Sequence, residues 1–581
     1  MTSKIFNFNI GLVGHVDSGK TSLAKALSTT ASTAAFDKHP QSQERGITLD
    51  LGFSSFEMDI DSRLVERIPP LSNYDKLQFT LVDCPGHASL LRTVIGGASI
   101  IDFFILVIDA VKGVQTQTAE CLVVAEITRP DRMIVALNKI DCYPESEREQ
   151  KITKMTTRLR KTLSSTSFAN APIIPVSAKP GDPSASEPIG LSALVEAIQK
   201  CLYFPDRTPS GPFLFSVDHC FALRGQGTVL TGTVLSGQVK VNDTVEVSGV
   251  AETRKVKSIQ RFRKPVQSVS QGDRAGICVA QLDASLVERG LICTPATLQH
   301  TYAAIVNVHP IKFFKQPVRS KSKVHISIGH ETVMARCTFF GQADKIENGA
   351  DALWSQEFVW REFLCEHLTE SDSDKVLPTG DAKIETDSQT ETVAAFALLQ
   401  FDQPIRIPPN SLCIAAKFDA DIHSNICRLS FYGQVVCLFS DKQYVSKQLP
   451  DLKIYRLKQK SGNVERMSDE STVIANGLCK KETKLDLFTG LKVTLSTGEV
   501  GRVEGGFGQS GKVKVRIPAG LKPETIAILE AAANAKKKKR GRAADETSAA
   551  TADHNSDSLT SIKVFLKFKR YCFDAQKRMI Q

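Results

Sequence analysis

One stretch decides how the first part of this chain folds: Gly14-His15-Val16-Asp17-Ser18-Gly19-Lys20-Thr21. It stands between an alternating apolar run, 5–13, which predicts a strand, and residues 22–27, which predict a helix. A glycine-rich loop in that position binds phosphate, because its N–H groups point at one anion and the helix N-terminus adds a positive end. In this pattern we expect Lys20 to reach the β- and γ-phosphates and Thr21 to bind Mg²⁺. A simple glycine turn before a helix is the alternative.

Length and composition limit the classes of protein that this chain can be. With 581 residues it is too long for a single core, and about three to five domains are expected. It has no apolar run long enough to span a bilayer and no basic-then-apolar start, so we expect no membrane contact and a cytoplasmic location. The fourteen cysteines form no C-x-x-C pair, which argues against zinc and disulfides. The net charge of +10 is compatible with a polyanionic partner.

Further polar motifs follow apolar runs that predict strands. Each begins where a strand is expected to end, and helical stretches separate the strands. This alternation predicts a doubly wound, mostly parallel sheet, in which ligands bind at the carboxyl ends of the strands. The motifs are Asp83-Cys84-Pro85-Gly86-His87, Asn138-Lys139-Ile140-Asp141 and Ser177-Ala178-Lys179.

Each of these motifs has a role in binding a guanine nucleotide. Asp83 can bind the metal through water, and Gly86 can give its N–H to the γ-phosphate. The Asp141 carboxylate can accept hydrogen bonds from N1 and N2 of guanine, which adenine does not offer. The motif resembles the guanine-specificity motif of translational and other regulatory GTPases, and the cofactors implied are GTP, GDP and Mg²⁺. The predicted nucleotide-binding residues are Gly14, His15, Val16, Asp17, Ser18, Gly19, Lys20, Thr21, Asp83, Gly86, Asn138, Lys139, Asp141, Ser177, Ala178 and Lys179.

Residues 44–50 resemble the effector loop of translation-factor GTPases. The resemblance implies that Thr48 binds Mg²⁺ only when the γ-phosphate is present, so the metal residues are Thr21, Thr48 and Asp83. It also implies that His87, where Ras-like proteins have a glutamine, is catalytic and positions the attacking water once the ribosome orders it. The chain has no arginine finger in the phosphate loop, so we expect a GTPase that the ribosome stimulates. The alternatives are a structural threonine and a core histidine.

The pattern changes after a turn-rich linker at 205–212 to short β-type segments separated by glycines. We therefore predict a multidomain chain: an α/β P-loop GTPase domain, two β-barrels and an appended C-terminal β-rich domain. The predicted domains are 1–208, 209–300, 301–440 with an acidic insertion at about 342–392, and 441–581 with a disordered basic linker at about 531–557.

Residues 213–229 and 271–276 resemble domain 2 of elongation factor Tu, and 323–336 resemble the third domain, which meets tRNA. This sequence differs from elongation factor Tu at the pocket for the esterified amino acid. Asp218-His219 forms the wall of that pocket here, and Arg274 replaces an asparagine of the general factor. Cationic groups in that pocket suit a small anionic side chain, and selenocysteine is anionic at neutral pH. Together with 32–38 and 48–53, these residues resemble the selenocysteine-specific elongation factors of eukaryotes. That resemblance places Phe53, Asp218, His219 and Arg274 around the aminoacyl group. The alternative is a surface cluster in which His219 and Arg274 pair with Asp218 and Asp273.

The C-terminal region combines β-type alternation with basic residues. Alternation puts Lys563, Lys567 and Lys569 on one face of a strand, with Tyr455 and Tyr571 nearby in sequence, which is typical of phosphate contacts. A solvated barrel face is the alternative. The predicted RNA-binding residues are Lys480, Lys481, Lys563, Lys567, Lys569 and Arg570. The basic run 536–542 fits a nuclear import signal, and hence a nuclear pool, or a solvated linker.

The main hypothesis is a monomeric elongation factor that binds GTP and selenocysteinyl-tRNA and delivers it to the ribosome at recoded UGA codons. GTP hydrolysis would trigger release. The resemblance implies further partners, namely the selenocysteine insertion element of the messenger and its binding protein. One alternative is another tRNA-carrying translational GTPase, such as an initiator-tRNA carrier, which has no need for a cationic pocket. The other is a GTP-regulated RNA-binding scaffold, which would not depend on an esterified amino acid.

Overall fold

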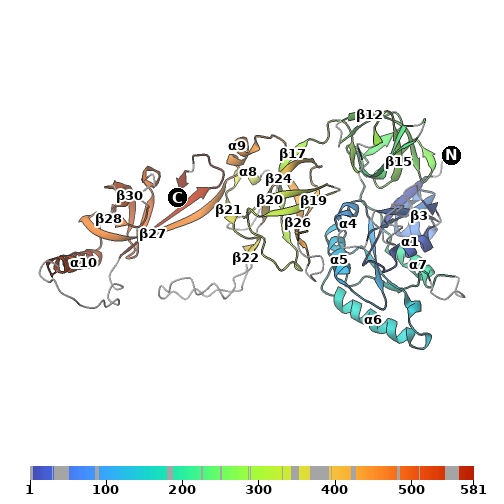
Figure 1. Cartoon of the computed structure of the whole chain (residues 1–581), viewed down its shortest axis with the longest axis horizontal. Coiled ribbons are helices and arrows are strands. Elements are labelled where there is room, and N and C mark those ends of the chain that lie inside the picture. The colour runs from blue at the N-terminus through green and yellow to red at the C-terminus, as the bar shows by residue number, and fades with distance from the viewer. Residues whose placement is uncertain are drawn as a thin grey trace. The chain divides into compact units, whose positions relative to one another are not determined.

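Figure 1 shows the computed structural model of the chain, which divides into two compact units. Unit 1 comprises Met1–Phe339 with Glu362–Asp441, and unit 2 comprises Phe340–Arg361 with Lys442–Gln581. The structure describes residues 4–28, 30–31, 51–85, 91–179, 187–207, 209–223, 225, 227–248, 252–284, 287, 289–329, 331–341, 352–366, 392–393, 395–419, 427–479, 485–508, 511–542, 562–576 and 578–581. No helix in these ranges is both long enough and apolar enough to cross a bilayer.

The first domain of unit 1 is built on a seven-stranded sheet of order β2-β3-β4-β1-β5-β6-β7. Its strands are β1 (Ile5–Val13), β2 (Thr30–Ala31), β3 (Gly52–Asp59), β4 (Lys76–Asp83), β5 (Phe103–Asp109), β6 (Met133–Asn138) and β7 (Ile173–Pro175). Its helices are α1 (Lys20–Leu27), α3 (Ser62–Arg67), α4 (Leu91–Ala98), α5 (Thr116–Thr128), α6 (Arg148–Leu163) and α7 (Leu191–Cys201), with short 3-10 turns between them. Neighbouring strands run parallel across β4-β1-β5-β6-β7, and β3 is antiparallel to β4. The predicted doubly wound, mostly parallel sheet is therefore confirmed.

Apolar side chains cover both faces of this sheet. On β5, Phe103 and Ile105 belong to one buried cluster, whereas Phe104 and Leu106 belong to the cluster on the opposite face. A strand buried on both sides needs apolar residues at every position, which is why this one reads as a continuous apolar run. Because the central strands are parallel, their carboxyl ends meet at one edge, where the predicted motifs begin.

The second domain is a closed barrel. Its strands follow the order β11-β16-β8-β9-β15-β12-β13, and an additional pairing between β11 and β12 closes the ring. The strands are β8 (Leu214–Leu223), β9 (Gly227–Ser236), β10 (Gln238–Lys240), β11 (Thr244–Val247), β12 (Glu252–Arg261), β13 (Lys264–Val266), β14 (Ser268–Ser270), β15 (Arg274–Val279) and β16 (Gly290–Cys293). We call this domain barrel 2.

The third domain of unit 1, barrel 3, closes in the same way. Its order is β19-β25-β26-β17-β24-β20, and β19 also pairs with β20. The strands are β17 (His300–Asn307), β18 (His309–Pro310), β19 (Lys323–Ile328), β20 (Glu331–Gly341), β22 (Cys365–Glu366), β23 (Thr392–Val393), β24 (Phe396–Arg406), β25 (Leu412–Ala416) and β26 (Leu429–Phe439).

Unit 2 contains a further β-barrel, as the prediction of a β-rich C-terminal domain requires. Strands β27-β28-β31-β30-β29-β32 follow one another, and β27 pairs with β32 to close the ring. The strands are β21 (Phe358–Arg361), β27 (Ile454–Asp469), β28 (Thr472–Asn476), β29 (Lys492–Leu495), β30 (Val500–Phe507), β31 (Lys512–Arg516), β32 (Lys563–Tyr571) and β33 (Met579–Ile580). The helices are α8 (Ala352–Ser355), α9 (Tyr444–Lys447) and α10 (Pro523–Arg542).

Two sequence-based expectations differ from the structure. The predicted insertion at 342–392 contains α8 and β21. Strand β21 pairs with β27 of unit 2, and its buried Phe358 packs against Phe340 of the same unit. The predicted disordered linker at 531–557 begins inside α10, which extends to Arg542. Alanine and lysine are strong helix formers, so the alanine-rich and lysine-rich stretch there continues the helix. Other residues of both predicted segments lie outside the described part of the chain.

Candidate functional site

The phosphate loop has the backbone shape that anion binding needs. Gly14 and Gly19 have φ values of 146° and 93°, and Asp17 is also left-handed, at 61°. A Cβ on Gly14 would lie 2.3 Å from the Val107 carbonyl oxygen, so only glycine fits there. The Gly19 carbonyl accepts a hydrogen bond from the Leu23 N–H at 2.9 Å, which begins α1. Both motif glycines are therefore required by the geometry.

Lys20 lies across this loop. Its side chain is buried, and its Nζ donates to the His15 carbonyl oxygen at 2.7 Å. Burial lowers the pKa of the Lys20 ammonium, while Asp83 opposes that shift. Burial and the neighbouring Lys20 also lower the pKa of the half-buried His15, which favours its neutral form at pH 7. A phosphate placed in this loop would supply the charge that a buried ammonium lacks.

A pair of oxygen-bearing side chains stands at the start of α1 and the end of β4. The Thr21 hydroxyl donates to Asp83 Oδ2 at 2.6 Å, and the Asp83 side chain is buried. Mg²⁺ prefers such hard oxygen ligands, so the chemistry of these two residues fits this cation. Thr48, Gly86 and His87 were predicted to complete this site, but they lie outside the described residues.

The base-recognition motifs meet at the neighbouring strand end. Asn138 connects two loops, because its Nδ2 donates to the Ser18 carbonyl oxygen at 2.9 Å and its Oδ1 accepts from the Ala178 N–H at 3.1 Å. Asp141 Oδ1 accepts from the Ser177 hydroxyl at 2.5 Å, which orients the carboxylate. The structure therefore brings three separate motifs into one site.

Lys139 and Lys179 flank the base end of this site differently. Lys139 has a left-handed φ of 67°, and its ammonium lies 3.0 Å from Asp109 Oδ2. Burial would raise the pKa of Asp109, but backbone hydrogen bonds from Lys112 and Val111 and the contact with Lys139 hold it below its usual range. Lys179 is exposed. Of the remaining loop residues, His15 and Val16 are half-buried and Asp17 is exposed.

Three of the four residues predicted for the aminoacyl pocket come together. The Arg274 guanidinium, at the start of β15, lies 2.6 Å from Asp218 Oδ2 on β8, and its Cζ lies 3.0 Å from the ring centroid of Phe53 on β3. Arg274 is 4% exposed and Asp218 is 3% exposed, so this is a buried ion pair and not a surface cluster. Asp273 pairs instead with Arg261, at 3.3 Å.

A β-bulge separates Asp218 from His219. Val217 stands opposite Gly232 and His219 opposite Thr231, so Asp218 is the extra residue of β8. A bulge redirects the side chain that it contains, and here it directs Asp218 to Arg274. His219 is half-buried, and its carbonyl oxygen accepts from the Thr231 hydroxyl at 3.4 Å. Simple alternation along the strand does not reveal this irregularity.

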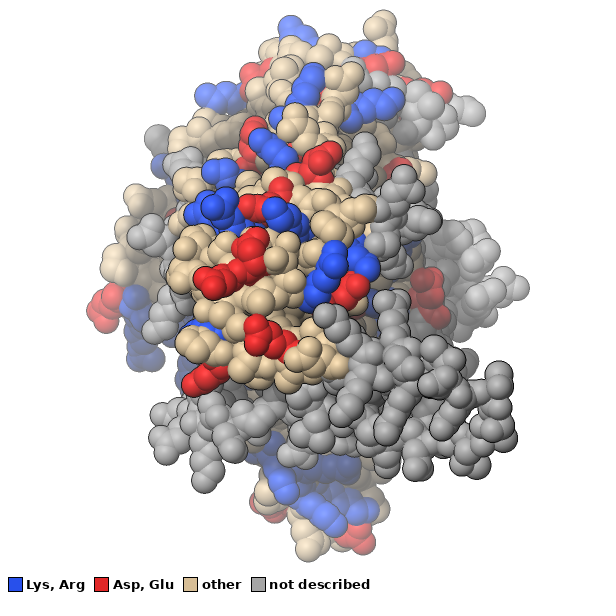
Figure 2. All heavy atoms as spheres, turned by 90° about the vertical axis from the view of Figure 1, so that its left-hand side faces the viewer, with Lys and Arg blue, Asp and Glu red and all other residues tan. Residues whose placement is uncertain are grey.

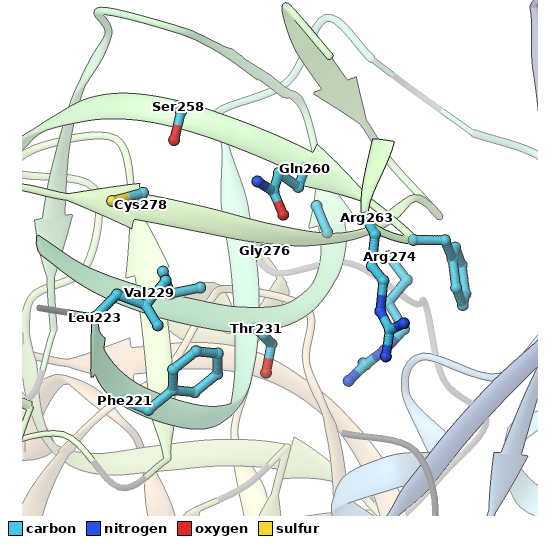
Figure 3. A pocket seen from close by; sticks show the side chains of 12 residues that line it. Phe221, Leu223, Val229, Thr231, Ser258, Gln260, Arg263, Arg274, Gly276 and Cys278 are labelled. Atoms are coloured by element: carbon cyan, nitrogen blue, oxygen red, sulfur yellow. The ribbon is translucent and has the colours of Figure 1, made fainter. Parts of the chain in front are cut away.

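A cavity of about 150 Å³ in barrel 2 begins at Arg274. Figure 3 shows Arg263 and Arg274 at one end of this cavity. The sequence analysis did not predict the cavity. Apolar side chains and hydrogen-bonding groups share its lining, as suits a planar base with polar edges. The lining residues are Phe221, Leu223, Val229, Thr231, Ser258, Gln260, Phe262, Arg263, Arg274, Ala275, Gly276 and Cys278.

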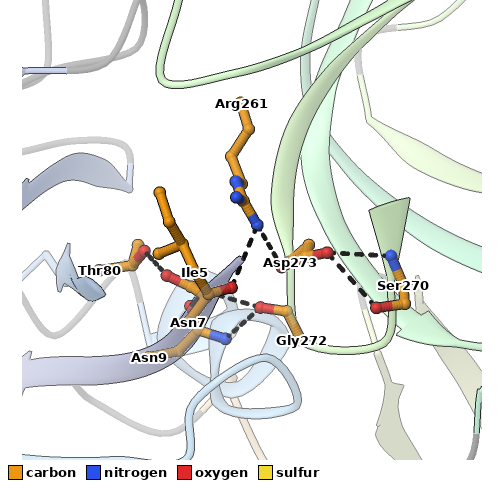
Figure 4. Close-up of polar contacts among 8 residues, drawn as sticks. All are labelled: Ile5, Asn7, Asn9, Thr80, Arg261, Ser270, Gly272 and Asp273. Carbon is orange, nitrogen blue, oxygen red and sulfur yellow. Dashed lines mark hydrogen bonds and ion pairs between the residues drawn. The ribbon is translucent and has the colours of Figure 1, made fainter. Parts of the chain in front are cut away.

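Barrel 2 is held to the GTPase domain by polar contacts that the sequence did not predict. Figure 4 shows the Asn7 and Asn9 side chains of β1, whose Nδ2 atoms donate to the Gly272 carbonyl oxygen at 2.7 and 3.0 Å. Both asparagines are buried, although a central parallel strand is ordinarily apolar. Nearby, Arg207 forms an ion pair with Asp102 at 2.8 Å. Asparagines in a buried strand were the signal that this face meets another domain.

The predicted RNA-binding residues of unit 2 differ in their surroundings. Lys563, Lys567 and Arg570 are exposed, whereas Lys569 lies 2.6 Å from Glu357 Oε2. On the face that Figure 2 shows, basic and acidic side chains are interspersed and not separated by sign. Lys480 and Lys481 lie outside the described residues.

Comparison with known protein families gives a match for each of the four domains of the chain. Residues 6–203 match the elongation factor Tu GTP binding domain and 227–294 match elongation factor Tu domain 2. Residues 305–433 match the third domain of the selenocysteine-specific elongation factor of eukaryotes, and 450–577 match the eEFSec C-terminal RIFT domain.

Named proteins agree with these matches. The selenocysteine-specific elongation factor of Mus musculus is 48% identical over 593 residues, which cover 100% of both chains. That of Methanocaldococcus jannaschii is 39% identical over 334 residues, 57% of this chain and 65% of that protein. The crystal structure of translation elongation factor SelB from Methanococcus maripaludis in complex with the GTP analogue GppNHp shares the fold, with a TM-score of 0.64 at 24% identity over 98% of this chain and 99% of that chain. The chain therefore belongs to the selenocysteine-specific elongation factors, a family of translational GTPases.

Proposed function

We propose that this chain, as a monomer, carries selenocysteinyl-tRNA to the ribosome at recoded UGA codons. GTP binds the site described above, where Thr21, Thr48 and, through water, Asp83 would hold Mg²⁺. Mg²⁺ there would shield the charge of the phosphates. His87 positions the attacking water when the ribosome orders it, and hydrolysis releases the tRNA.

One observation carries this proposal, namely the contact of Phe53 with Arg274. Phe53 belongs to the GTPase domain and stands five positions after Thr48, whereas Arg274 belongs to barrel 2. A rearrangement of the effector segment that displaced the start of β3 would move the ring that covers the guanidinium. The contact between Phe53 and Arg274 would therefore link the nucleotide site to the amino-acid pocket. A carrier that must release its cargo after hydrolysis requires such a link.

The pocket is suited to an anionic amino acid. A guanidinium carries five N–H donors in a rigid fork, so Arg274 can hold Asp218 and also donate to a selenolate. Asp218 fixes the orientation of the fork, and His219 stands at the next position. A serine ester lacks the negative charge that this site stabilises. The adjoining cavity of about 150 Å³ takes the terminal base of the tRNA, with Gln260 and Thr231 as hydrogen-bonding partners.

The test is the nucleotide dependence of tRNA binding in Phe53→Leu. We expect the wild-type protein to bind selenocysteinyl-tRNA more tightly with a non-hydrolysable GTP analogue than with GDP, and Phe53→Leu to reduce that ratio at least about tenfold, as a coupling of about 1–3 kcal/mol allows. Arg254→Ala, at a half-buried position of the same barrel that pairs with Glu252, is the matched control and keeps the ratio. An unchanged ratio in folded Phe53→Leu would refute the coupling.

We further propose that unit 2 contacts the selenocysteine insertion element and its binding protein. Strands β27 and β32 form an antiparallel ribbon in which Tyr455 stands opposite Tyr571, with ring centroids 6.2 Å apart. Residues 453–464 and 562–573 contain no acidic residue. Aromatic rings beside cations favour RNA, because bases stack on the rings and phosphates attract the cations.

Salt dependence tests the RNA contact. Replacing Lys563, Lys567 and Arg570 by glutamine should weaken binding of the insertion element and lower the slope of log K against log salt by about 0.7 to 0.9 for each phosphate that the variant no longer neutralises. Replacing Lys512 and Lys514, which pair with Glu465 and Glu504, is the control. An unchanged slope would mean that unit 2 meets the insertion element only through its binding protein.

The end of α10 supports a proposal about location. The basic run 536–542 provides the charge density of a nuclear import signal, so we propose a nuclear pool beside the cytoplasmic one. Serine at those basic positions should abolish nuclear fluorescence of a tagged chain and leave the cytoplasmic signal. Equal nuclear signal in both proteins would refute the proposal.

A further inference from the structure

A deeply buried ion pair joins barrel 3 to the GTPase domain. Arg428, directly before β26, donates from Nε to Glu120 Oε1 at 2.9 Å and from Nη2 to Glu120 Oε2 at 2.7 Å. Both side chains are only 5% exposed. A two-pronged contact fixes orientation as well as distance, and removing one partner of a buried ion pair is costly because the other charge stays buried.

The helix that carries Glu120 also holds the phosphate loop. In α5, Gln117 Oε1 accepts a hydrogen bond from the Val16 N–H at 3.4 Å. One turn further on, burial raises the pKa of the Cys121 thiol to about 11, although a backbone hydrogen bond from Gly14 acts in the opposite direction. Residues three and four apart share one side of a helix, so Gln117, Glu120 and Cys121 lie close together. Gln117 and Cys121 contact the phosphate loop, and Glu120 contacts barrel 3.

Apolar packing encloses the ion pair. Leu429 and Ile414 of barrel 3 belong to the same buried cluster as Leu122 and Val123 of α5. Water is excluded from such an interface, and close-packed groups have few alternative arrangements. The helix cannot shift against barrel 3 without breaking the contact between Arg428 and Glu120.

We propose that Arg428 is a positioning residue for the nucleotide site. Through Glu120 it fixes α5, and α5 in turn holds the phosphate loop at Gly14 and Val16. When barrel 3 moves away, the loop loses this support and releases its nucleotide faster. Coupling between sites is reciprocal, so a bound nucleotide also strengthens the contact of barrel 3 with the GTPase domain.

The experiment measures release of a fluorescent GDP from the full-length protein by stopped flow, together with the thermal unfolding midpoint. The variants are Arg428→Lys, which keeps the charge but loses the fork, Glu120→Gln, and the double variant. The control is Arg406→Lys. Arg406 joins barrel 3 to barrel 2 through Glu246 at 2.8 Å, and the two side chains are 14% and 13% exposed. Within the described part of the chain, the other hydrogen-bond partners of that pair are Ala296 and His300, which belong to neither α5 nor the phosphate loop.

We expect Arg428→Lys and Glu120→Gln each to accelerate GDP release about five- to fiftyfold, within the usual range of coupling between sites. The double variant should be no faster than about twice the faster single variant, because both changes remove one interaction. Arg406→Lys should release GDP within about twofold of the wild-type rate.

Three results would overturn the proposal. Folded Arg428→Lys that releases GDP at the wild-type rate would show that the pair is only structural. Equal acceleration in Arg406→Lys would show that any loosening of barrel 3 has the same effect. Fully additive effects in the double variant would show that the two residues act separately. If Glu120→Gln does not fold, Arg428→Lys and its control still decide.

Discussion

Arg274 and Asp218 form an ion pair of 2.6 Å inside barrel 2, and the pair is almost completely buried. Buried ion pairs add little to stability relative to apolar residues, so their presence calls for another reason. The ring of Phe53 covers the guanidinium from the GTPase domain. The pair therefore presents an oriented cation where two domains meet, and an oriented cation can discriminate between a selenolate and a hydroxyl.

Asp218→Asn tests the orienting role. The amide no longer carries the charge that holds the guanidinium, so we expect affinity for selenocysteinyl-tRNA to fall about tenfold or more, consistent with the usual strength of charge-assisted hydrogen bonds. Affinity for seryl-tRNA of the same sequence should change less. Fluorescence titration of both tRNAs measures this. Equal losses for the two would mean that Asp218 acts only on barrel stability.

Asp141→Asn should change the base that the nucleotide site accepts. An amide keeps one acceptor oxygen for N1 of guanine, but its NH2 group faces the N2 amino group, so guanine loses one hydrogen bond and two donors meet. Xanthine offers an oxygen at position 2, which accepts from the same NH2 group. We expect affinity for GTP to fall about 10⁴-fold, as for other sites built around buried hydrogen bonds, and xanthosine triphosphate to become the better ligand. Competition between the two nucleotides measures the change. Continued preference for GTP would remove Asp141 from base recognition.

The hydroxyl of Thr21 should be needed for the metal. Thr21→Ala removes the hydroxyl that bonds to Asp83, so we expect the Mg²⁺ concentration for half-maximal GTP binding to rise about ten- to a hundredfold. Thr21→Ser keeps the hydroxyl and is the matched control. Binding of GTP with and without a chelator measures the effect. If Thr21→Ala behaves like Thr21→Ser, the hydroxyl does not bind the metal.

The contact between Glu357 and Lys569 should make the stability of unit 2 depend on pH. Hydrogen bonds from Lys569 and Tyr571 lower the pKa of Glu357. The same hydrogen bond between Lys569 and Glu357 raises the pKa of Lys569. The lowered pKa of Glu357 stabilises the folded state above about pH 4.3, and this stabilisation is lost as the pH falls through the folded-state pKa. The raised pKa of Lys569 stabilises the folded state below about pH 10.4, and this stabilisation is lost as the pH rises through the folded-state pKa.

Glu357→Gln should therefore destabilise unit 2 between about pH 5 and pH 10 and have no effect below about pH 3. The pair is partly exposed, so the loss in the free energy of unfolding should stay below about 1 kcal/mol. Lys567→Gln, at an exposed position of the same strand, is the control and should show no such window. Denaturant unfolding as a function of pH measures both. A constant difference at every pH would contradict the assignment.

Gly272→Ala should weaken the junction of barrel 2 with the GTPase domain. The residue has a φ of +88°, and a Cβ there would lie 2.1 Å from the Arg207 guanidinium carbon, which the ion pair with Asp102 holds in place. Gly329→Ala, with a φ of +56° and no atom of the described residues within 4 Å of its Cβ, costs only the backbone strain of about 1–2 kcal/mol. We expect Gly272→Ala to lower the free energy of unfolding by more than Gly329→Ala. Equal losses in denaturant unfolding would contradict this.

The GTPase domain could be predicted from sequence because its motifs are local. Each motif begins where a strand ends, and parallel strands bring those ends to one edge without further information. The barrels could be predicted as a class from short segments and glycines. The resemblance to selenocysteine-specific factors is confirmed over the full length by the mouse relative, so neither the initiator-tRNA carrier nor the RNA-binding scaffold describes this chain.

Contacts between distant segments could not be predicted. The ion pair of Glu120 and Arg428 joins residues 308 positions apart, and neither residue belongs to a motif. The bulge at Asp218 breaks the alternation from which its direction would be inferred. Likewise β21 reads as part of an acidic insertion, because only its pairing with β27 shows that it belongs to unit 2.

The most direct test of the central claim is protection of the aminoacyl ester against hydrolysis. The selenocysteinyl, seryl and cysteinyl forms of one tRNA are compared with a non-hydrolysable GTP analogue and with GDP, in the wild-type protein and in Arg274→Ala. The account predicts strong protection of the selenocysteinyl ester alone, only with the GTP analogue, and its loss in Arg274→Ala. Equal protection of all three esters would place the specificity in the tRNA body and contradict the assignment of Phe53, Asp218, His219 and Arg274.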